Sequence, residues 1–401
     1  MTQDIQHQVD QLLLEQGEYL PLEFLLQEGR LLYADYEAWR NGEFDYLDKA
    51  LFGDHEHIKQ QLTQAADYLQ RRGWQAEPIV YHSWLDDTTR RLHFSQNDAL
   101  DQCFHQGYHK PEDQPQMDLF TDAPATTLFN GITQALMNRN PPEARRLLEQ
   151  LYDMAPDHAR LGELEHLVEA AEGLGTPSDN AAADMQMLQQ TLTPLAKSLL
   201  GKNSRNLLIP LWRRLSAALQ NQPYQSTNPT LHPSYTASQS MDWETVHHAV
   251  ESEPNWHTDA VLLLRHARAC EYLHQKPEAL LSWFKLCWQF PAQCDIFESS
   301  NDHELRQQWI HFLELEPEMP VQSFPAWLLL TKPGLVRQLP EPDSIPEIND
   351  IACPASYVAL YQLQYERMQP HAKNESDNAM ALRAQLKQQD PELFQHFLNN
   401  I

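Results

Sequence analysis

Residues 258–291 read TDAVLLLRHARACEYLHQKPEALLSWFKLCWQFP, and this stretch decides the fold class. Its apolar side chains recur every three or four residues, which is the spacing of one face of an α-helix. The pattern breaks at a polar step around His274 and resumes after Pro277, where proline is tolerated in the first turn of a helix. We therefore predict two helices joined by a short turn, with Pro291 ending the second.

The composition extends this helical character to the whole chain. Only 12 of the 401 residues are Gly and 27 are Pro, while Leu, Gln, Ala and Glu are abundant. These residue types favour helix, and the prolines are expected mainly between helices. We therefore predict a mostly α protein in which an N-terminal α+β unit precedes a series of paired helices.

Residues 1–110 are the part of the chain in which β-structure is expected. AEPIVYHSW at residues 76–84 and RRLHFS at residues 90–95 are short runs typical of strands. They flank the sequence LDDTT, whose Asp residues favour a turn, so we predict a short β-hairpin. Helix is expected again over residues 96–108.

Local signals predict where the helices of this unit end. Asp54 precedes an amphipathic segment and is expected to be its N-cap. Gly73 follows the last turn of the same segment, where a left-handed conformation is favoured. Asn97 or Asp98 is the expected N-cap of the next helix.

Two stretches have the composition of linkers. Residues 111–127 are rich in Pro and acidic residues, and residues 221–240 are rich in Pro, Ser, Thr and Asn. They divide the chain into an N-terminal domain of residues 1–110 and two helical domains, residues 128–220 and 241–401.

An internal correspondence links the two helical domains. Pro142-Glu143-Ala144 and Pro277-Glu278-Ala279 lie 135 residues apart, and so do Pro156 and Pro291. At the same offset, Leu148 corresponds to Trp283. The alternative is a pair of ordinary helical hairpins whose Pro-Glu-Ala turns coincide.

This pattern resembles the tetratricopeptide repeat, a helix-turn-helix unit of about 34 residues. The resemblance covers two units and implies a degenerate α-solenoid. It also implies that a small residue lets the paired helices approach, that a bulky residue fills the groove of the next unit, and that Pro ends the unit. The residues that would pack the repeats in this way are Ala144, Leu148, Pro156, Ala279, Trp283 and Pro291.

Charge and cysteine content restrict the partners and the compartment. The net charge is −27, which repels phosphate backbones and anionic lipids, so we expect neither broad nucleic-acid binding nor a membrane partner. The five cysteines are widely spaced and predict no disulfide framework or zinc ribbon. Since neither a signal peptide nor a membrane-spanning apolar run is visible, we expect a cytoplasmic protein.

Sequence patterns of catalysis are not found in the chain. It has no His-Glu-x-x-His, Gly-x-Ser-x-Gly or P-loop pattern, so we predict no catalytic residue, metal or cofactor. The adjacent His247 and His248 are interpreted as part of an ordinary amphipathic helix. The alternative is an enzyme whose site lies in the N-terminal domain, and its candidate residues are His55, His57, Tyr81 and His82.

The first linker contains apolar side chains that need an explanation. Its centre reads Gln116-Met117-Asp118-Leu119-Phe120. This pentapeptide resembles the sequence by which many bacterial replication and repair proteins dock on the DNA polymerase sliding clamp. In that family Gln is followed by an aliphatic residue, Ser or Asp, Leu and Phe, so all five positions match.

The resemblance assigns a role to each residue of the pentapeptide. Gln116 would form a hydrogen bond at the mouth of the clamp pocket and Met117 would lie against its edge. Asp118 would help to hold the backbone, while Leu119 and Phe120 would fill the apolar floor. The alternative is that Leu119 and Phe120 staple the linker onto the first helix of the following domain. The function that we expect from the sequence is therefore that of a non-catalytic adaptor for protein partners, with the bacterial sliding clamp as one candidate.

Overall fold

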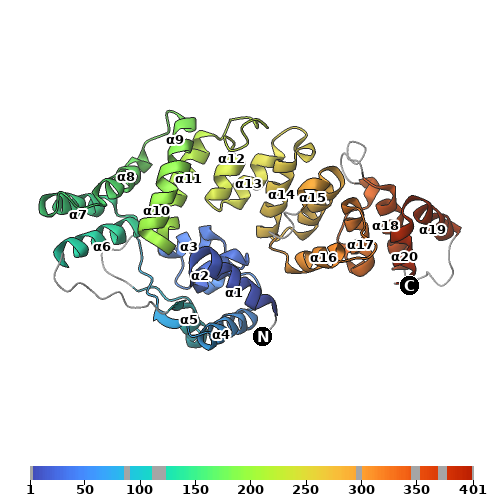
Figure 1. Ribbon diagram of the computed structural model, residues 1–401, viewed down its shortest axis with the longest axis horizontal. Helices are drawn as coiled ribbons and strands as arrows, with labels where there is room; N and C mark the ends of the chain where they lie inside the picture. Colours follow the sequence, from blue (N-terminus) through green and yellow to red (C-terminus); the bar gives the residue numbers. More distant parts are fainter. Residues whose placement is uncertain are drawn as a thin grey trace. The chain divides into compact units, whose positions relative to one another are not determined.

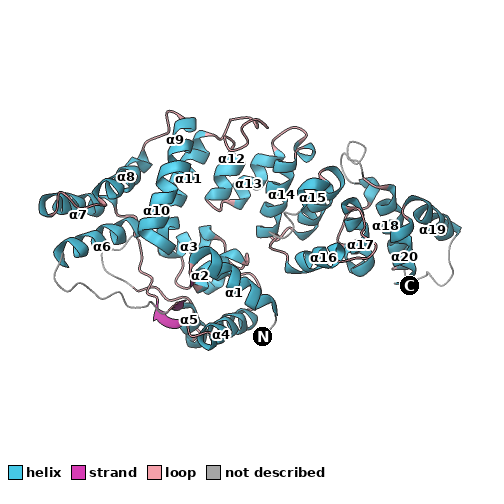
Figure 2. Ribbon diagram, viewed as in Figure 1, coloured by secondary structure: helices cyan, strands magenta, loops and turns pink. Residues whose placement is uncertain are grey.

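The computed structural model describes residues 3–84, 91–110, 123–294, 300–344, 353–368 and 377–399. Most of these residues are helical, and the strands are confined to the N-terminal part (Figure 2). The prediction of a mostly α protein with a small N-terminal β-element is therefore confirmed. The chain divides into two compact units, residues 1–242 and residues 243–401.

The N-terminal part of the first unit combines short helices with a small sheet. Its helices are α1 (Gln3–Gln16), α2 (Pro21–Gln27), α3 (Tyr33–Arg40), α4 (His55–Arg71) and α5 (Asp98–Phe104), with a 3-10 turn, η1, at Leu47–Ala50. Its strands are β1 (Glu18–Tyr19), β2 (Gln75–Pro78) and β3 (Gln106–His109). The sheet has the order β1-β3-β2, and both of its pairings are antiparallel.

The strand pairing differs from the predicted hairpin. Residues 75–78 pair with β3, and the two predicted runs are joined by one isolated bridge between His82 and Arg91. Residues 106–108, expected to be helical, belong to the central strand. A Cβ atom at Gly107 would lie 3.0 Å from Ile79 and 3.1 Å from Leu20, so a larger residue there would have to displace these two side chains.

The predicted helix ends in this part are confirmed. The Asp54 side chain accepts a hydrogen bond from the Glu56 N–H at the start of α4, and the Asn97 side chain caps α5. Gly73 follows α4 with a φ of +81°. The apolar side of α4 packs into an aromatic core, whose members include Trp39, Tyr81, Phe94 and Phe104.

Seven further helices lie in the described residues of the first unit (Figure 1). They are α6 (Ala123–Met137), α7 (Pro141–Met154), α8 (Leu161–Glu172), α9 (Ala181–Met187), α10 (Thr193–Leu200), α11 (Ser204–Ala218) and α12 (Pro233–Gln239). Short turns of other helix types, η2 (Gly173–Gly175), η3 (Leu188–Leu192) and η4 (Gly201–Asn203), lie between them. The expected linker at residues 221–240 thus contains α12, in which Ser234, Thr236 and Ala237 are buried.

Buried ion pairs join the N-terminal part to the helices that follow it. The Glu37 carboxylate on α3 pairs with Arg139, after α6, and with Arg213 on α11. Glu23 on α2 pairs with Arg205 on α11 in the same way. Because both carboxylates are buried, these pairs fix α2 and α3 against α11 within one unit.

The second unit is helical over its described residues. Its helices are α13 (Trp243–Glu251), α14 (Ala260–Tyr272), α15 (Lys276–Gln289), α16 (His303–Leu313), α17 (Phe324–Thr331), α18 (Ala355–Arg367), α19 (Asp377–Gln389) and α20 (Pro391–Asn399). Four 3-10 turns accompany them: η5 (Trp256–Thr258), η7 (Val321–Ser323), η8 (Pro333–Arg337) and η9 (Pro342–Ser344). One continuous core of aromatic and aliphatic side chains, including Trp283, Trp309 and Tyr357, runs through the unit.

None of the helices in the described part of the chain combines the length and the apolar character that crossing a bilayer requires.

Candidate functional site

The two helical hairpins that correspond in sequence also correspond in structure. The helices α7 and α15 begin 135 residues apart, at Pro141 and Lys276, and end 135 residues apart, at Met154 and Gln289. The preceding helices, α6 and α14, also end at this offset, at Met137 and Tyr272.

The turns inside the two hairpins have the same backbone hydrogen bonds. The Asn140 N–H donates to the Ala135 carbonyl at 2.9 Å, and the Gln275 N–H donates to the Cys270 carbonyl at 2.8 Å. The residues before these donors, Arg139 and His274, have φ values of +56° and +58°. The same cap ends α4 at Gly73, so the turn alone does not define a repeat; the constant offset of the flanking helices does.

The six residues expected to pack the repeats occupy equivalent places in the two hairpins. Ala144 and Ala279 are buried in the first turns of α7 and α15. Leu148 and Trp283 are buried one turn later, while Pro156 and Pro291 lie two residues past the helix ends. The four residues inside the helices are thus buried, while their roles in packing a repeat and membership of the tetratricopeptide family remain predictions.

The clamp-like pentapeptide lies outside the described residues. Gln116, Met117, Asp118, Leu119 and Phe120 all fall in the gap between residues 110 and 123. The elements on either side are anchored, because Tyr108 of β3 and Ala125 of α6 are buried.

The four candidate residues of the alternative enzymatic site lie in different surroundings. His55 and His57 are exposed on the first turn of α4. The Tyr81 ring is buried against Trp39 and Phe104, and burial raises its pKa well above the ordinary value. A phenol in this environment stays protonated and packs the core. The adjacent His82 uses its backbone carbonyl to accept a hydrogen bond from Arg40 at 2.7 Å.

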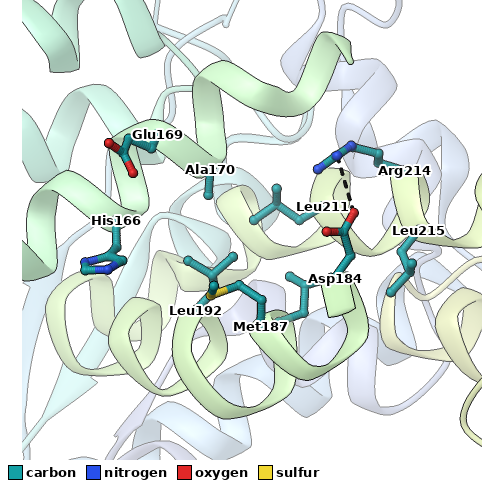
Figure 3. Close-up of a pocket in the computed structure, with 10 residues that line it drawn as sticks. His166, Glu169, Ala170, Asp184, Met187, Leu192, Leu211, Arg214 and Leu215 are labelled. Carbon is teal, nitrogen blue, oxygen red and sulfur yellow. Dashed lines mark ion pairs between the residues drawn. The ribbon is translucent and has the colours of Figure 1, made fainter. Parts of the chain in front are cut away.

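A pocket of about 230 Å³ opens between α8, α9, η3 and α11 in the first unit (Figure 3). Its apolar lining comes from Ala170, Leu188, Leu192, Leu211 and Leu215. The rim is polar, and in it Arg214 pairs with Asp184 at 3.4 Å. Met187, half exposed beside the pocket, adds a flexible apolar side chain of the kind that adapts to different ligands.

A π-helical turn shapes one wall of this pocket. The turn η3, Leu188–Leu192, connects α9 to α10, and two of the pocket's leucines belong to it. Pro194 lies two residues after this turn, in the first turn of α10. In a regular α-helix its ring would collide with the Gln190 carbonyl, and it has no N–H to donate. The wider π turn accommodates the proline, and turns of this kind are frequent at functional sites.

A cluster of side chains that could hold a metal ion lies between α13 and α14 in the second unit. His247 and Glu251 come from α13, while His266 and Cys270 come from α14. The ligand atoms of His247, His266 and Cys270 all lie within 4.8 Å of one another. The His266 ring is stacked on Trp256 at 4.2 Å between ring centres, which fixes its orientation.

Burial controls the protonation of this cluster. It lowers the pKa of His266 to about 3, with help from the nearby charges of His247 and Lys285. Burial also raises the pKa of the Cys270 thiol to about 12, and neighbouring carboxylates add to this effect. A neutral imidazole beside a protonated thiol is not an activated nucleophile, so the pair does not resemble a Cys-His catalytic dyad.

The sequence carries a signal for this cluster in the spacing of two pairs of residues. His247 and Glu251 are four residues apart on one helix, and His266 and Cys270 are four apart on the next. Each pair therefore shares a helix face. The interpretation of His247 as part of an ordinary amphipathic helix leaves out the second pair, which lies on a different helix and becomes a neighbour only in the fold.

A scan against protein-family models, a search of curated proteins and a search of solved structures each gave no match to this chain.

Proposed function

We propose that the protein is a non-catalytic adaptor that binds protein partners, and that Gln116–Phe120 docks it on the bacterial DNA polymerase sliding clamp. The observation that carries the second part is the match of all five positions to the clamp-binding pattern. The pentapeptide belongs to a connection whose two ends are anchored in cores, at Tyr108 and Ala125. A partner can therefore bind this connecting segment without unfolding the elements on either side of it.

The binding energy would come mainly from two anchors. Burial of Leu119 and Phe120 in an apolar pocket contributes roughly 2–3 kcal/mol each, before the cost of ordering the peptide. Gln116, Met117 and Asp118 would orient the peptide by hydrogen bonds and edge contacts. Such an interaction is of moderate strength, which suits an adaptor that associates reversibly.

The helical parts support the adaptor class. The two corresponding hairpins, α6–α7 and α14–α15, agree with a degenerate tetratricopeptide-like solenoid, in which stacked hairpins offer extended binding surfaces. The pocket beside η3 offers a place for an apolar side chain of a second partner. The net charge of −27 favours partners with basic surfaces.

We further propose the cytoplasm as the compartment. All five cysteines are free thiols, and three of them, Cys270, Cys287 and Cys294, are buried. Free buried thiols are ordinary in a reducing compartment.

Binding of the full chain to a purified bacterial sliding clamp tests the docking proposal. The wild type is expected to bind in a calorimetric titration, and an unlabelled clamp-binding peptide is expected to compete. The double variant Leu119→Ala/Phe120→Ala should weaken binding by at least about a hundredfold, since both anchors are lost. The matched control is Asp113→Ala/Gln114→Ala, which alters the same connection outside the pentapeptide. Equal affinity of the wild type and the anchor variant would exclude this mode of docking.

A further inference from the structure

The cluster between α13 and α14 is built from two matched pairs of potential metal ligands. Each helix presents its pair at a spacing of four residues, so both members of a pair face the same side. His247 on α13 thereby meets His266 and Cys270 on α14, and their ligand atoms lie within 4.8 Å of one another. The Glu251 carboxylate lies beside the two imidazoles.

The distances from the carboxylate to the two imidazoles are those of neighbouring ligands around one metal ion. The Glu251 carboxylate lies 3.4 Å from His247 Nδ1 and 3.6 Å from His266 Nε2. The Cys270 Sγ lies 3.8 Å from the same His266 Nε2. These separations exceed those of good N–H···O hydrogen bonds. A tetrahedral zinc ion, with its usual bond lengths to nitrogen, oxygen and sulfur, would place its ligand atoms about 3.3–3.6 Å apart.

The surroundings of His266 prepare it to act as a ligand. Its Nδ1 lies 2.8 Å from the Ser282 hydroxyl on α15. With Nδ1–H donating to this hydroxyl, Nε2 carries the free lone pair and lies 3.6 Å from the Glu251 carboxylate. The Cys270 Sγ lies beside the same ring, 3.6 Å from Nδ1 and 3.8 Å from Nε2. A hydrogen bond of this kind on the far nitrogen is the usual support of a metal-binding histidine. The stacked Trp256 prevents the ring from turning away.

We propose that His247, Glu251, His266 and Cys270 bind one Zn²⁺ ion between α13 and α14. Nitrogen, sulfur and one oxygen suit zinc, whereas Ca²⁺ and Mg²⁺ require mainly oxygen ligands. On binding, the Cys270 S–H proton leaves to solvent and an S–Zn bond replaces the S–H bond. Thiolate and carboxylate together then balance the two charges of the ion.

Access and charge determine how strongly the site binds. Cys270 and His266 are buried, while the Glu251 side chain is 48% exposed, so the ion would enter from the Glu251 side. The buried Lys285, whose charge acts on His266, opposes a cation and lowers the affinity. The bound ion would join the first two helices of the second unit, and the site is therefore structural.

Cobalt provides the direct test, because Co²⁺ occupies zinc sites and is coloured. Full-length protein, treated with chelator and desalted, is titrated with Co²⁺. We expect one equivalent to bind, with a thiolate-to-cobalt charge-transfer band and the intense visible bands of tetrahedral cobalt. One equivalent of Zn²⁺ should remove both, while Mg²⁺ and Ca²⁺ should not.

Substitutions of single residues identify the side chains that bind the metal. Cys270→Ser should lose the charge-transfer band, while the matched control Cys353→Ser, at a half-buried thiol in the same unit, should keep it. His247→Ala removes a partly exposed ligand without opening the core, and it should weaken binding at least about tenfold. Absence of the band in the wild type, or its persistence in Cys270→Ser, would overturn the proposal. If Cys270→Ser does not fold, unchanged affinity in His247→Ala would overturn it.

Discussion

The guanidinium of Arg139 donates a 2.5 Å hydrogen bond to the Glu37 carboxylate across 102 residues of sequence. Arg213 pairs with the other oxygen of the same carboxylate. Only 7% of the Glu37 side chain is exposed, so its charge depends on these two partners for compensation. One acidic side chain thus links the N-terminal part of the first unit to α6 and α11.

Replacing Glu37 by Ala tests this junction. The change leaves Arg139 and Arg213 without their shared carboxylate, and we expect the free energy of unfolding to fall by about 2–3 kcal/mol. The loss is no larger, because both arginines still reach solvent. The measurement is urea unfolding followed by circular dichroism. Glu143→Ala is the matched control, since Glu143 forms an exposed pair with Arg146 and should change stability little. Equal effects of the two variants would contradict the role of Glu37.

At Gly73 the backbone conformation, and not a side-chain contact, favours glycine. Its φ of +81° is unfavourable for other residues, although a Cβ atom there would meet nothing within 4 Å. We expect Gly73→Ala to lower the free energy of unfolding by about 1 kcal/mol. Gly162, in the first turn of α8, has equally open surroundings and no positive φ, so Gly162→Ala should be neutral or slightly stabilising. If both variants lost stability equally, backbone strain would not be the cause.

The close approach within each hairpin can be tested at its alanines. Ala144 is fully buried at the start of α7, and Ala279 occupies the equivalent place in α15. Leu at either position overfills the contact, and we expect each change to cost about 1–3 kcal/mol by thermal or urea unfolding. Ala183→Leu, on an exposed side of α9, should have little effect. A stable Ala144→Leu variant would show that the helices do not need a small residue there.

The stability of the first unit should depend on the protonation of His105. Burial lowers the pKa of this imidazole, and Arg91 and His93 act in the same direction, although the Ile79 carbonyl and Asp101 oppose them. The unfolded chain therefore binds a proton more readily than the folded one below about pH 6.5. Stability from this group is complete above that pH and is lost as the pH falls toward the lowered pKa.

The comparison of variants isolates this effect. Between pH 7.5 and pH 5.5, the wild type should lose more stability than His105→Gln, by up to about 1.4 kcal/mol per pH unit, the value for one proton. His57→Gln, at an exposed histidine on α4, should keep the wild-type dependence. A His105→Gln variant with the same pH dependence as the wild type would exclude this histidine as the source.

Local features were predictable from the sequence. The caps at Asp54 and Asn97 and the left-handed Gly73 depend on a few consecutive residues, and their side-chain chemistry is sufficient. The hairpin around Ala279 was predictable for the same reason, because each helix has its own apolar period.

Features that depend on distant residues were not predictable in the same way. The strand β2 pairs with β3, which lies about thirty residues further along the chain, and no local pattern shows this pairing. Residues 233–239 have linker composition, yet Ser234 and Thr236 are buried in α12, where the Thr236 hydroxyl bonds to the Pro233 carbonyl. The ligand cluster at His266 became visible only when two helices with matched spacings were brought together.

Residue 139 carries two requirements that conflict. Its φ of +56° would suit glycine, but its side chain donates to Glu37 and lies with its guanidinium 4.0 Å from the Trp84 ring. Arg139→Gly would therefore relax the turn and dismantle the junction at once, and the second effect is larger. In a Glu37→Ala background much of the loss has already occurred, so the same substitution should cost less. The effect on stability of a substitution in this hairpin turn thus depends on a partner more than a hundred positions away in the chain.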